Sequence, residues 1–189
     1  MALVLSTLKA DLKAALEDSF QSAKDLEGAT PSQVESARPP IVEALVTASA
    51  EATKAYLESM QDLSGDNPAA IPMAPLESIF SEVFGMSGET EQRVPQAEVQ
   101  AAWSMLFPVS FQVAAPAPGM ASETTSIASA VTPLGPIAGA YQMSSDEDGL
   151  EEFTSVIAEA IDTGASAITT TIIGVAPNGS PVTVSGPVS

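Results

Sequence analysis

The chain has 189 residues, of which 45% are hydrophobic and 5% aromatic, and it contains neither histidine nor cysteine. Without these residues it lacks the usual general base near neutral pH, a thiolate nucleophile and most transition-metal ligand sets. We therefore expect no enzyme, no cofactor and no catalytic or metal site. Six basic residues face 24 acidic ones, for a net charge of -18. Because phosphate backbones and anionic membranes are bound through Lys and Arg, we expect no direct nucleic-acid partner and no membrane partner.

Residues 1–107 predict a helical domain. Leucines at helical spacing predict a first amphipathic helix over residues 6–26, ended by Gly28. Pro39-Pro40 predicts a break, because proline lacks the N–H that a helix interior needs. Proline suits a first helical turn, so a second helix is expected over residues 40–63.

Two further helices complete this domain. Pro75 opens a third helix whose apolar residues recur at i, i+3, i+4, i+7 and i+8, which is typical of an amphipathic helix. Those residues are Leu76, Ile79, Phe80, Val83 and Phe84. Pro95 opens a fourth helix that carries Trp103 and ends before Pro108.

Residues 108–143 are rich in proline, glycine and alanine and predict an irregular segment. Val109, Phe111 and Val113 alternate like a short strand, and residues 122–131 favour one or two helical turns. A long irregular segment is unusual inside a compact domain. We therefore expect it to lie over a neighbouring surface.

Residues 144–164 predict a fifth helix that packs on the helical domain. Ser144 and Glu147 form a capping-box pattern, and Gly164 ends the helix. Residues 165–189 predict a β-prone arm, with the turn Pro177-Asn178-Gly179 between two β-rich runs. The expected fold is mainly α: four to five amphipathic helices, an irregular Pro/Gly-rich middle and a C-terminal β-hairpin or β arm.

Several short motifs resemble catalytic or binding motifs, but each lacks required elements or fits a structural role better. Ser6-Thr7-Leu8-Lys9 matches S-x-x-K, but the S-D-N and K-T-G elements of those acyl-transfer enzymes are absent. A calcium loop counted from Asp146 would need glutamate at position 12, where Ile157 stands. Asn178-Gly179-Ser180 fits a hairpin turn better than a glycosylation acceptor. Glu123 could pair in a cleft with four later acids, but nothing in the sequence determines such a geometry. We therefore interpret the later acids as residues on solvated helix faces. They are Glu151, Glu152, Glu159 and Asp162.

Contacts with partners are expected from large apolar residues near the C-terminus and in the middle of the chain. An uncharged, β-prone tail suits donation of a strand to a neighbour. The candidate partner-contact residues are Trp103, Phe111, Ile168, Ile172, Ile173, Val175, Val182 and Val184.

The order of parts resembles that of small uncharacterised virion proteins of tailed bacteriophages, especially contractile-tailed ones. A leucine-spaced helix follows Met1-Ala2-Leu3, and an alanine-rich helix comes next. The Pro-led segment from Ile71 to Phe80 is followed by the Pro/Ala/Gly-rich middle. A late helix then runs through Asp162-Thr163-Gly164 into the β-prone tail. The resemblance spans the whole chain and concerns its layout.

This resemblance implies a structural component of the virion, assembled in the host cytoplasm from contacts with other virion proteins and copies of itself. Tail, baseplate or neck is the expected location. A capsid decoration or cement protein is an alternative. An alternative of another class is a soluble acidic adaptor or inhibitor of a basic partner.

Overall fold

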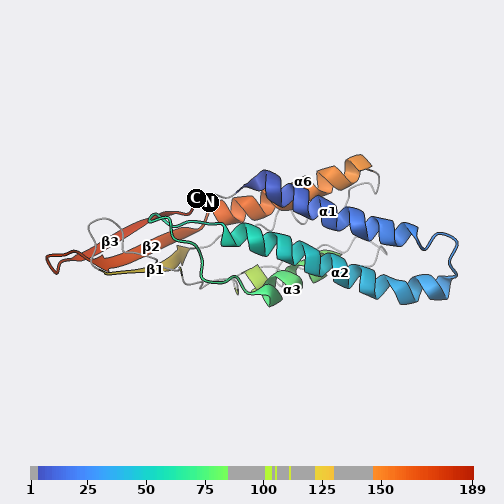
Figure 1. Ribbon diagram of the computed structural model, residues 1–189, viewed down its shortest axis with the longest axis horizontal. Coiled ribbons are helices and arrows are strands. Elements are labelled where there is room, and N and C mark those ends of the chain that lie inside the picture. Colours follow the sequence, from blue (N-terminus) through green and yellow to red (C-terminus); the bar gives the residue numbers. More distant parts are fainter. Residues whose placement is uncertain (1–3, 85–100, 104, 106–110, 112–121, 130–146) are drawn as a thin grey trace.

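The computed structural model describes residues 4–84, 101–103, 105, 111, 122–129 and 147–189. This part of the chain is mainly helical, with a C-terminal antiparallel hairpin, as the sequence predicts. Its helices are α1 (Leu5–Lys24), α2 (Pro31–Glu58), α3 (Met73–Phe84) and α6 (Glu147–Ser166); its strands are β1 (Ser122–Ser129), β2 (Thr169–Val175) and β3 (Pro181–Pro187). The molecule is elongated, with the sheet at one end and the turn between α1 and α2 at the other (Figure 1).

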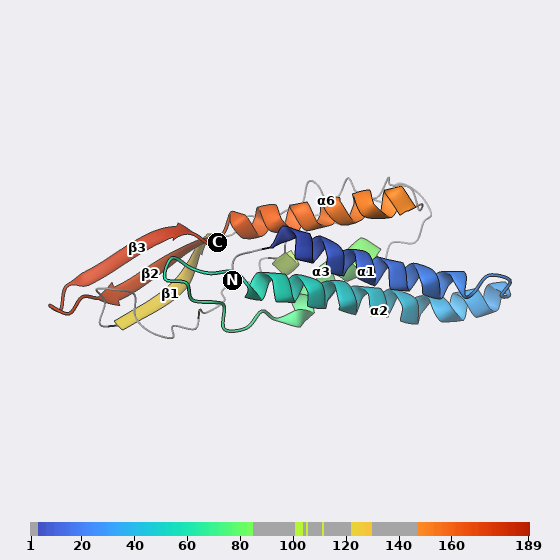
Figure 2. The same ribbon diagram turned by 45° about the horizontal axis from the view of Figure 1, so that its top comes forward.

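The helices pack in the order α6, α1, α2, α3. Neighbouring helices α1 and α2 run antiparallel, and α6 lies antiparallel along the first part of α1 (Figures 1 and 2). Apolar residues from all four helices share one core, which also includes Trp103, Phe111 and Ile168. The fifth predicted helix, α6, thus packs on the other helices mainly through α1.

Helix α2 corrects the predicted break at Pro39-Pro40. The helix begins at Pro31 and runs through both prolines without interruption. Its start is well specified, because the Gln33 side-chain oxygen accepts hydrogen bonds from the Thr30 N–H and hydroxyl, each at 2.8 Å. The two prolines leave the carbonyls of Glu35 and Ser36 without their helical donors. Both residues are exposed, so water can satisfy these groups, and the helix continues.

Two other helix boundaries differ slightly from expectation. Helix α3 begins at Met73, so Pro75 lies in its first turn, where a missing N–H costs little. Helix α6 passes through Gly164 and ends at Ser166. Residues 101–103 and 105 are helical, as predicted for the fourth helix, whereas Pro95, Pro108 and Ser144 lie outside the described residues.

The sheet corrects the helical turns predicted over residues 122–131. Residues 122–129 form β1, which pairs antiparallel with β2 from Ser122↔Val175 to Ser129↔Thr169. The run Thr124-Thr125 and Ile127 is β-branched, and the available strand β2 decides the outcome over weak local preference. Part of the irregular middle thus lies in this chain's own sheet. Val109 and Val113 lie outside the described residues, and Phe111 forms an isolated bridge with Pro68.

The predicted C-terminal hairpin is confirmed, and its turn lies at Pro177-Asn178-Gly179, as expected. Strand β2 is central in the order β1-β2-β3. The Ala176 N–H donates to the Ser180 carbonyl at 2.8 Å, which leaves Pro177-Asn178-Gly179 as the loop. Gly179 has φ +85°, which only glycine adopts without strain in such three-residue loops.

The last residues of the chain are fixed to its own body. Ser189 and Gln61 exchange two backbone hydrogen bonds of 2.9 Å, and Val188 is buried. Gly186 lies so close to Leu63 that a Cβ would stand 2.8 Å from its Cδ2 atom. The base of the β2–β3 hairpin is therefore part of the core, and its loop forms one end of the molecule (Figure 1).

Candidate interaction surfaces

Half of the predicted contact residues are buried within the chain. Ile168 and Ile172 lie under the base of the hairpin, and Trp103 and Phe111 belong to the core between helices and sheet. A buried side chain offers no surface to a partner unless the fold opens. In this fold they anchor the hairpin and the middle of the chain.

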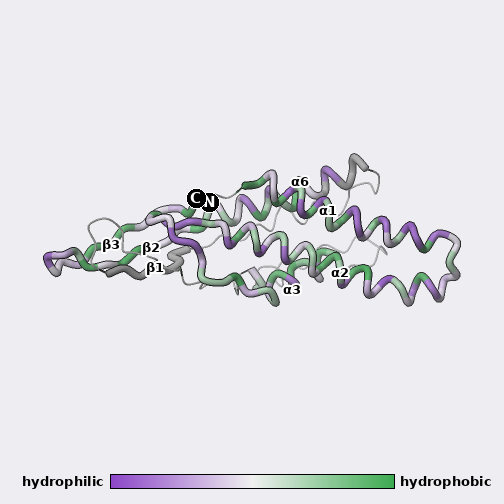
Figure 3. The backbone as a smooth tube through the Cα atoms, viewed as in Figure 1, coloured by the Kyte–Doolittle hydropathy of each residue, from purple (hydrophilic) through white to green (hydrophobic). Residues whose placement is uncertain are grey.

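The other half lies on the outer part of the hairpin. Ile173, Val175 and Val184 are 52%, 40% and 42% exposed, and Val182 is half-buried. Side chains alternate between the two faces of a strand. Ile173 and Val175 therefore share one face, whereas Val184, opposite Ile172 in the register, lies on the other. Both faces of the outer hairpin thus expose apolar side chains, and hydrophobic residues mark β2 in Figure 3.

The outer edge of β3 is poorly suited to pairing with another strand. The Val188 N–H donates to the Ile168 carbonyl, and Ala176 pairs with Ser180 in the same way. Because bonded pairs alternate along an antiparallel ladder, the intervening residues of β3 direct their backbone groups away from β2. These residues are Pro181, Thr183, Ser185 and Pro187. Two of the four lack an N–H, a common protection of edge strands, so strand donation through this edge is disfavoured.

The opposite end of the molecule carries an apolar groove that the sequence did not reveal. It lies between the outer parts of α1 and α2 and has a volume of about 580 Å³. It is lined by Phe20, Ala23, Lys24, Leu26, Glu27, Val34, Arg38, Ile41 and Val42. Phe20, Ala23 and Leu26 were recognisable as one apolar side of the first helix. Their neighbours were not, because Val34 and Arg38 lie between the first two predicted helices, outside both.

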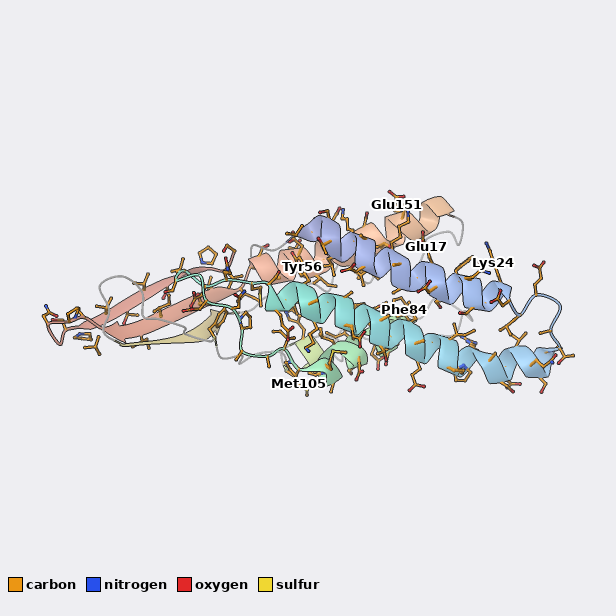
Figure 4. All side chains as sticks on the ribbon, viewed as in Figure 1. Glu17, Lys24, Tyr56, Phe84, Met105 and Glu151 are labelled. Carbon is orange, nitrogen blue, oxygen red and sulfur yellow. The ribbon has the colours of Figure 1, made fainter. Side chains whose placement is uncertain are left out.

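The basic residues divide into two groups by position. Lys9, Lys13 and Lys54 form ion pairs with Glu159, Glu151 and Glu58 at 2.7, 3.3 and 3.5 Å, respectively. Lys24 and Arg38 line the groove instead, and neither forms an ion pair with any residue that the structure describes. The Lys24 ammonium stands 5.9 Å from the centre of the Phe20 ring, and Figure 4 shows it near the outer end of α1.

The acidic residues considered for a cleft do not converge. Glu151 and Glu159 bind Lys13 and Lys9 along the α1–α6 contact, and Asp162 accepts a hydrogen bond from the Tyr56 hydroxyl. Glu123 belongs to β1. Within the described ranges, no group of three or more acidic residues could hold a metal ion.

Tyr56 and Asp162 form a polar link between α2 and α6. Tyr56 is buried, and burial, followed by the hydrogen bond and the negative charge of Asp162, raises the pKa of the phenol. The hydroxyl therefore stays protonated and keeps donating to the carboxylate. The pair lies near the sheet end of α2 (Figure 4), and its role is to fasten α6 to the bundle.

The buried carboxylate of Asp62 serves the loop after α2. One of its oxygens accepts the backbone N–H groups of Ser64 and Asp66 at 2.8 and 2.9 Å. Asn67 donates to the Met60 carbonyl at 2.8 Å. These bonds satisfy a turn that Gly65 makes with φ +84°. The loop is thus a local structural unit that holds Leu63 against the hairpin.

Among the described helices, none is both long and apolar enough to cross a membrane. Comparison of the chain with protein-family models, curated proteins and solved structures found no match. The features of this chain that bear on its function are the exposed apolar surfaces at the two ends of the molecule.

Proposed function

We propose that the chain is a non-enzymatic structural component of a tailed-phage virion, in the tail, baseplate or neck. It acts through protein–protein contacts with other virion proteins and copies of itself. The observation that carries the proposal is the exposed apolar surface at the end of the β2–β3 hairpin, far from the helical core. The layout of the chain and its lack of histidine and cysteine support the same proposal.

The hairpin end has the properties of a contact surface. About half of the surface of Ile173 and Val175 is exposed to water. In the same strand, Thr170 is fully buried and Ile172 is almost fully buried. Exposed apolar side chains that cluster on one element are typical of interaction sites. The segment from Ala165 to Ser189 carries no charged side chain, so a partner can cover it without desolvating an ion.

The form of the contact follows from the edge of β3. Because Pro181 and Pro187 remove two of its four outward donors, a partner gains little from adding a strand there. We therefore propose packing against the face that carries Ile173 and Val175. This replaces strand donation by the arm as the mode of assembly.

Substitution at this face tests the proposal better than deletion. Removing residues 165–189 would also remove the buried Ile168, Ile172 and Val188, so loss of assembly would only report loss of the fold. The double variant Ile173→Ser and Val175→Ser keeps the core intact. We expect it to be depleted from purified virions, measured by quantitative mass spectrometry of separated heads and tails.

The matched control is Thr183→Val together with Ser185→Val, on the same face of β3. These changes keep the fold and retain the apolar contact, so this variant should enter particles normally. Equal incorporation of the serine variant and the unmodified chain would contradict the role of this face. Recovery of the chain in heads alone would favour a decoration or cement protein instead.

The net charge of -18 favours one rival, an acidic adaptor or inhibitor of a basic partner. Such a complex would weaken steeply as salt is added, because screening acts on exposed charges. Contacts through Ile173 and Val175 are apolar and should change little with salt. Binding to isolated particles at low and high ionic strength separates the two functions.

A further inference from the structure

The outer halves of α1 and α2 form a helical pair whose apolar side has no cover within the described part of the chain. The buried residues of α1 are Leu8, Leu12 and Ala15, and those of α2 begin at Leu45. No residue from Leu16 to Ala44 is buried. Isolated helices are marginal in water, and their stability in proteins comes mainly from packing of an apolar face.

The groove between these helices combines apolar side chains with unpaired positive charge. Phe20 and Val34 are 37% and 41% exposed at its surface. Lys24 and Arg38 lie beside them and form no ion pair in the described structure, although the chain carries a fourfold excess of acids. A surface of this composition fits a partner helix that is apolar on one side and acidic at its margins.

We propose that the occupant of this groove is the corresponding groove of a second copy of the chain. Acidic residues of the same two helices lie close to these cations: Glu27 lines the groove with them. Glu17 and Glu35 are exposed and stand one helical turn before the groove residues Phe20 and Arg38. In a two-fold contact the same patch is used on both copies, so the cations of one copy meet acids of the other. The apolar sides of four helices then close into a bundle, the standard packing for such helical pairs.

The ionic-strength dependence distinguishes this contact from binding to a basic partner. Two copies of a chain with net charge -18 repel each other outside the contact. Screening confines this repulsion to about 10 Å at 0.1 M salt. Association of two copies is therefore expected to strengthen when salt rises from a low to a physiological level.

Sedimentation equilibrium of the full chain tests the inference. We expect a concentration-dependent dimer, and we expect Phe20→Ser with Val34→Ser to raise its dissociation constant by about tenfold or more, since the centre of an apolar contact carries most of the binding energy. Both residues are exposed, so the fold should persist, as circular dichroism can check. The matched control is Val4→Ser with Met105→Ser, two exposed apolar residues outside both the groove and the hairpin face, which should leave the dimer unchanged. A monomer at every concentration, or equal loss in both variants, would overturn the inference.

Cross-linking provides a second measurement that does not depend on weakening the contact. The chain has no cysteine, so a single introduced thiol reports only its own surroundings. Ala23→Cys, in the groove, should form linked dimers with a short bis-maleimide much faster than Asn178→Cys, in the hairpin loop. Equal rates would contradict a contact through the groove.

The inference deepens the proposed assembly role by naming one partner, and the outcomes separate the two claims. A chain that enters virions through Ile173 and Val175 but stays monomeric would overturn the contact between copies alone. A chain that dimerises through the groove but is absent from purified virions would overturn the phage role alone.

Discussion

The inner and outer halves of α1 and α2 have similar apolar spacing but different surroundings. In the inner halves, Leu8, Leu12 and Leu57 are buried under α3 and α6. In the outer halves, Phe20 and Val34 follow the same helical spacing and remain exposed. The difference teaches that periodicity shows which side of a helix is apolar, whereas neighbouring elements determine whether that side is covered.

The largest expected difference in stability between the two halves is that between substitutions of two phenylalanines. Phe80 in α3 is 1% exposed, and its ring stacks on Phe84 with centroids 5.7 Å apart. We expect Phe80→Ala to lower the free energy of unfolding by about 3–5 kcal/mol, because it removes a large buried ring and leaves a cavity. Phe20→Ala should cost less than about 1 kcal/mol in dilute solution, since its ring is partly hydrated. Urea unfolding of both variants measures the difference.

Repeating the unfolding measurement at several protein concentrations separates the two variants further. Folding coupled to dimer formation becomes more favourable as concentration rises. The cost of Phe20→Ala should therefore grow with concentration, whereas that of Phe80→Ala should stay nearly constant. Similar large costs for both residues in dilute solution would mean that the outer half is packed within a single chain.

Replacing a proline of α2 should have the next largest effect on stability, and this effect should be limited to the outer half. Proline in a helix interior costs about 3 kcal/mol relative to alanine, and its rigidity in the unfolded chain offsets up to about 1 kcal/mol. We expect Pro39→Ala to slow amide hydrogen exchange in residues 31–44 by stabilising this half by about 2 kcal/mol. Exchange near Leu57 should be unaffected. Faster exchange in residues 31–44 would show that the proline stabilises the observed conformation.

Local signals predicted the elements whose apolar spacing matches their burial. The third helix was found because Leu76, Ile79, Phe80 and Val83 all enter the core. The hairpin was found because Asn178-Gly179 separates two β-branched runs. Residues 122–129 were assigned to helical turns, because the strand that pairs with them begins 40 residues later and leaves no local mark. The start of α2 was missed because its capping by Thr30 and Gln33 outweighs the prolines.

The exposed apolar surfaces could be predicted from the sequence only in part, for a related reason. Apolar β-branched residues were identified correctly in the tail, but exposure separates Ile173 and Val175 from Ile168 and Ile172. That separation depends on what covers each face of the sheet. The groove requires two helices to lie side by side beyond their neighbours, and a wrong start for α2 hides that arrangement.

Tyr56 tests the inner half through its pH dependence. Tyr56→Phe removes the hydrogen bond to Asp162 and should cost about 1.5 kcal/mol near neutral pH, as for bonds to charged groups. Burial raises the pKa of Tyr56 in the folded state, so above about pH 10 only the unfolded chain loses this proton. The stabilising effect of the phenol is therefore complete below that pH and decreases as pH rises. The gap between the two proteins should stay constant up to about pH 9 and shrink as pH rises through about 10 and above, and a gap that stays constant above that pH would contradict the assignment.

The smallest expected effect concerns the ion pairs of the inner half. Lys9 in α1 binds Glu159 in α6 at 2.7 Å, but both side chains are partly exposed. Exposed pairs contribute about 0.2–1 kcal/mol, and salt screens them. Lys9→Gln should therefore cost about 0.5 kcal/mol in low salt and less in high salt. Lys54→Gln breaks the Glu58 pair within α2 and is the matched control, with a smaller cost because no second helix is involved. If Lys9→Gln costs several times more than Lys54→Gln at high salt, the α1–α6 contact depends on charge. If the two variants differ little in unfolding free energy and the difference falls with salt, apolar packing and not charge holds α6 against α1.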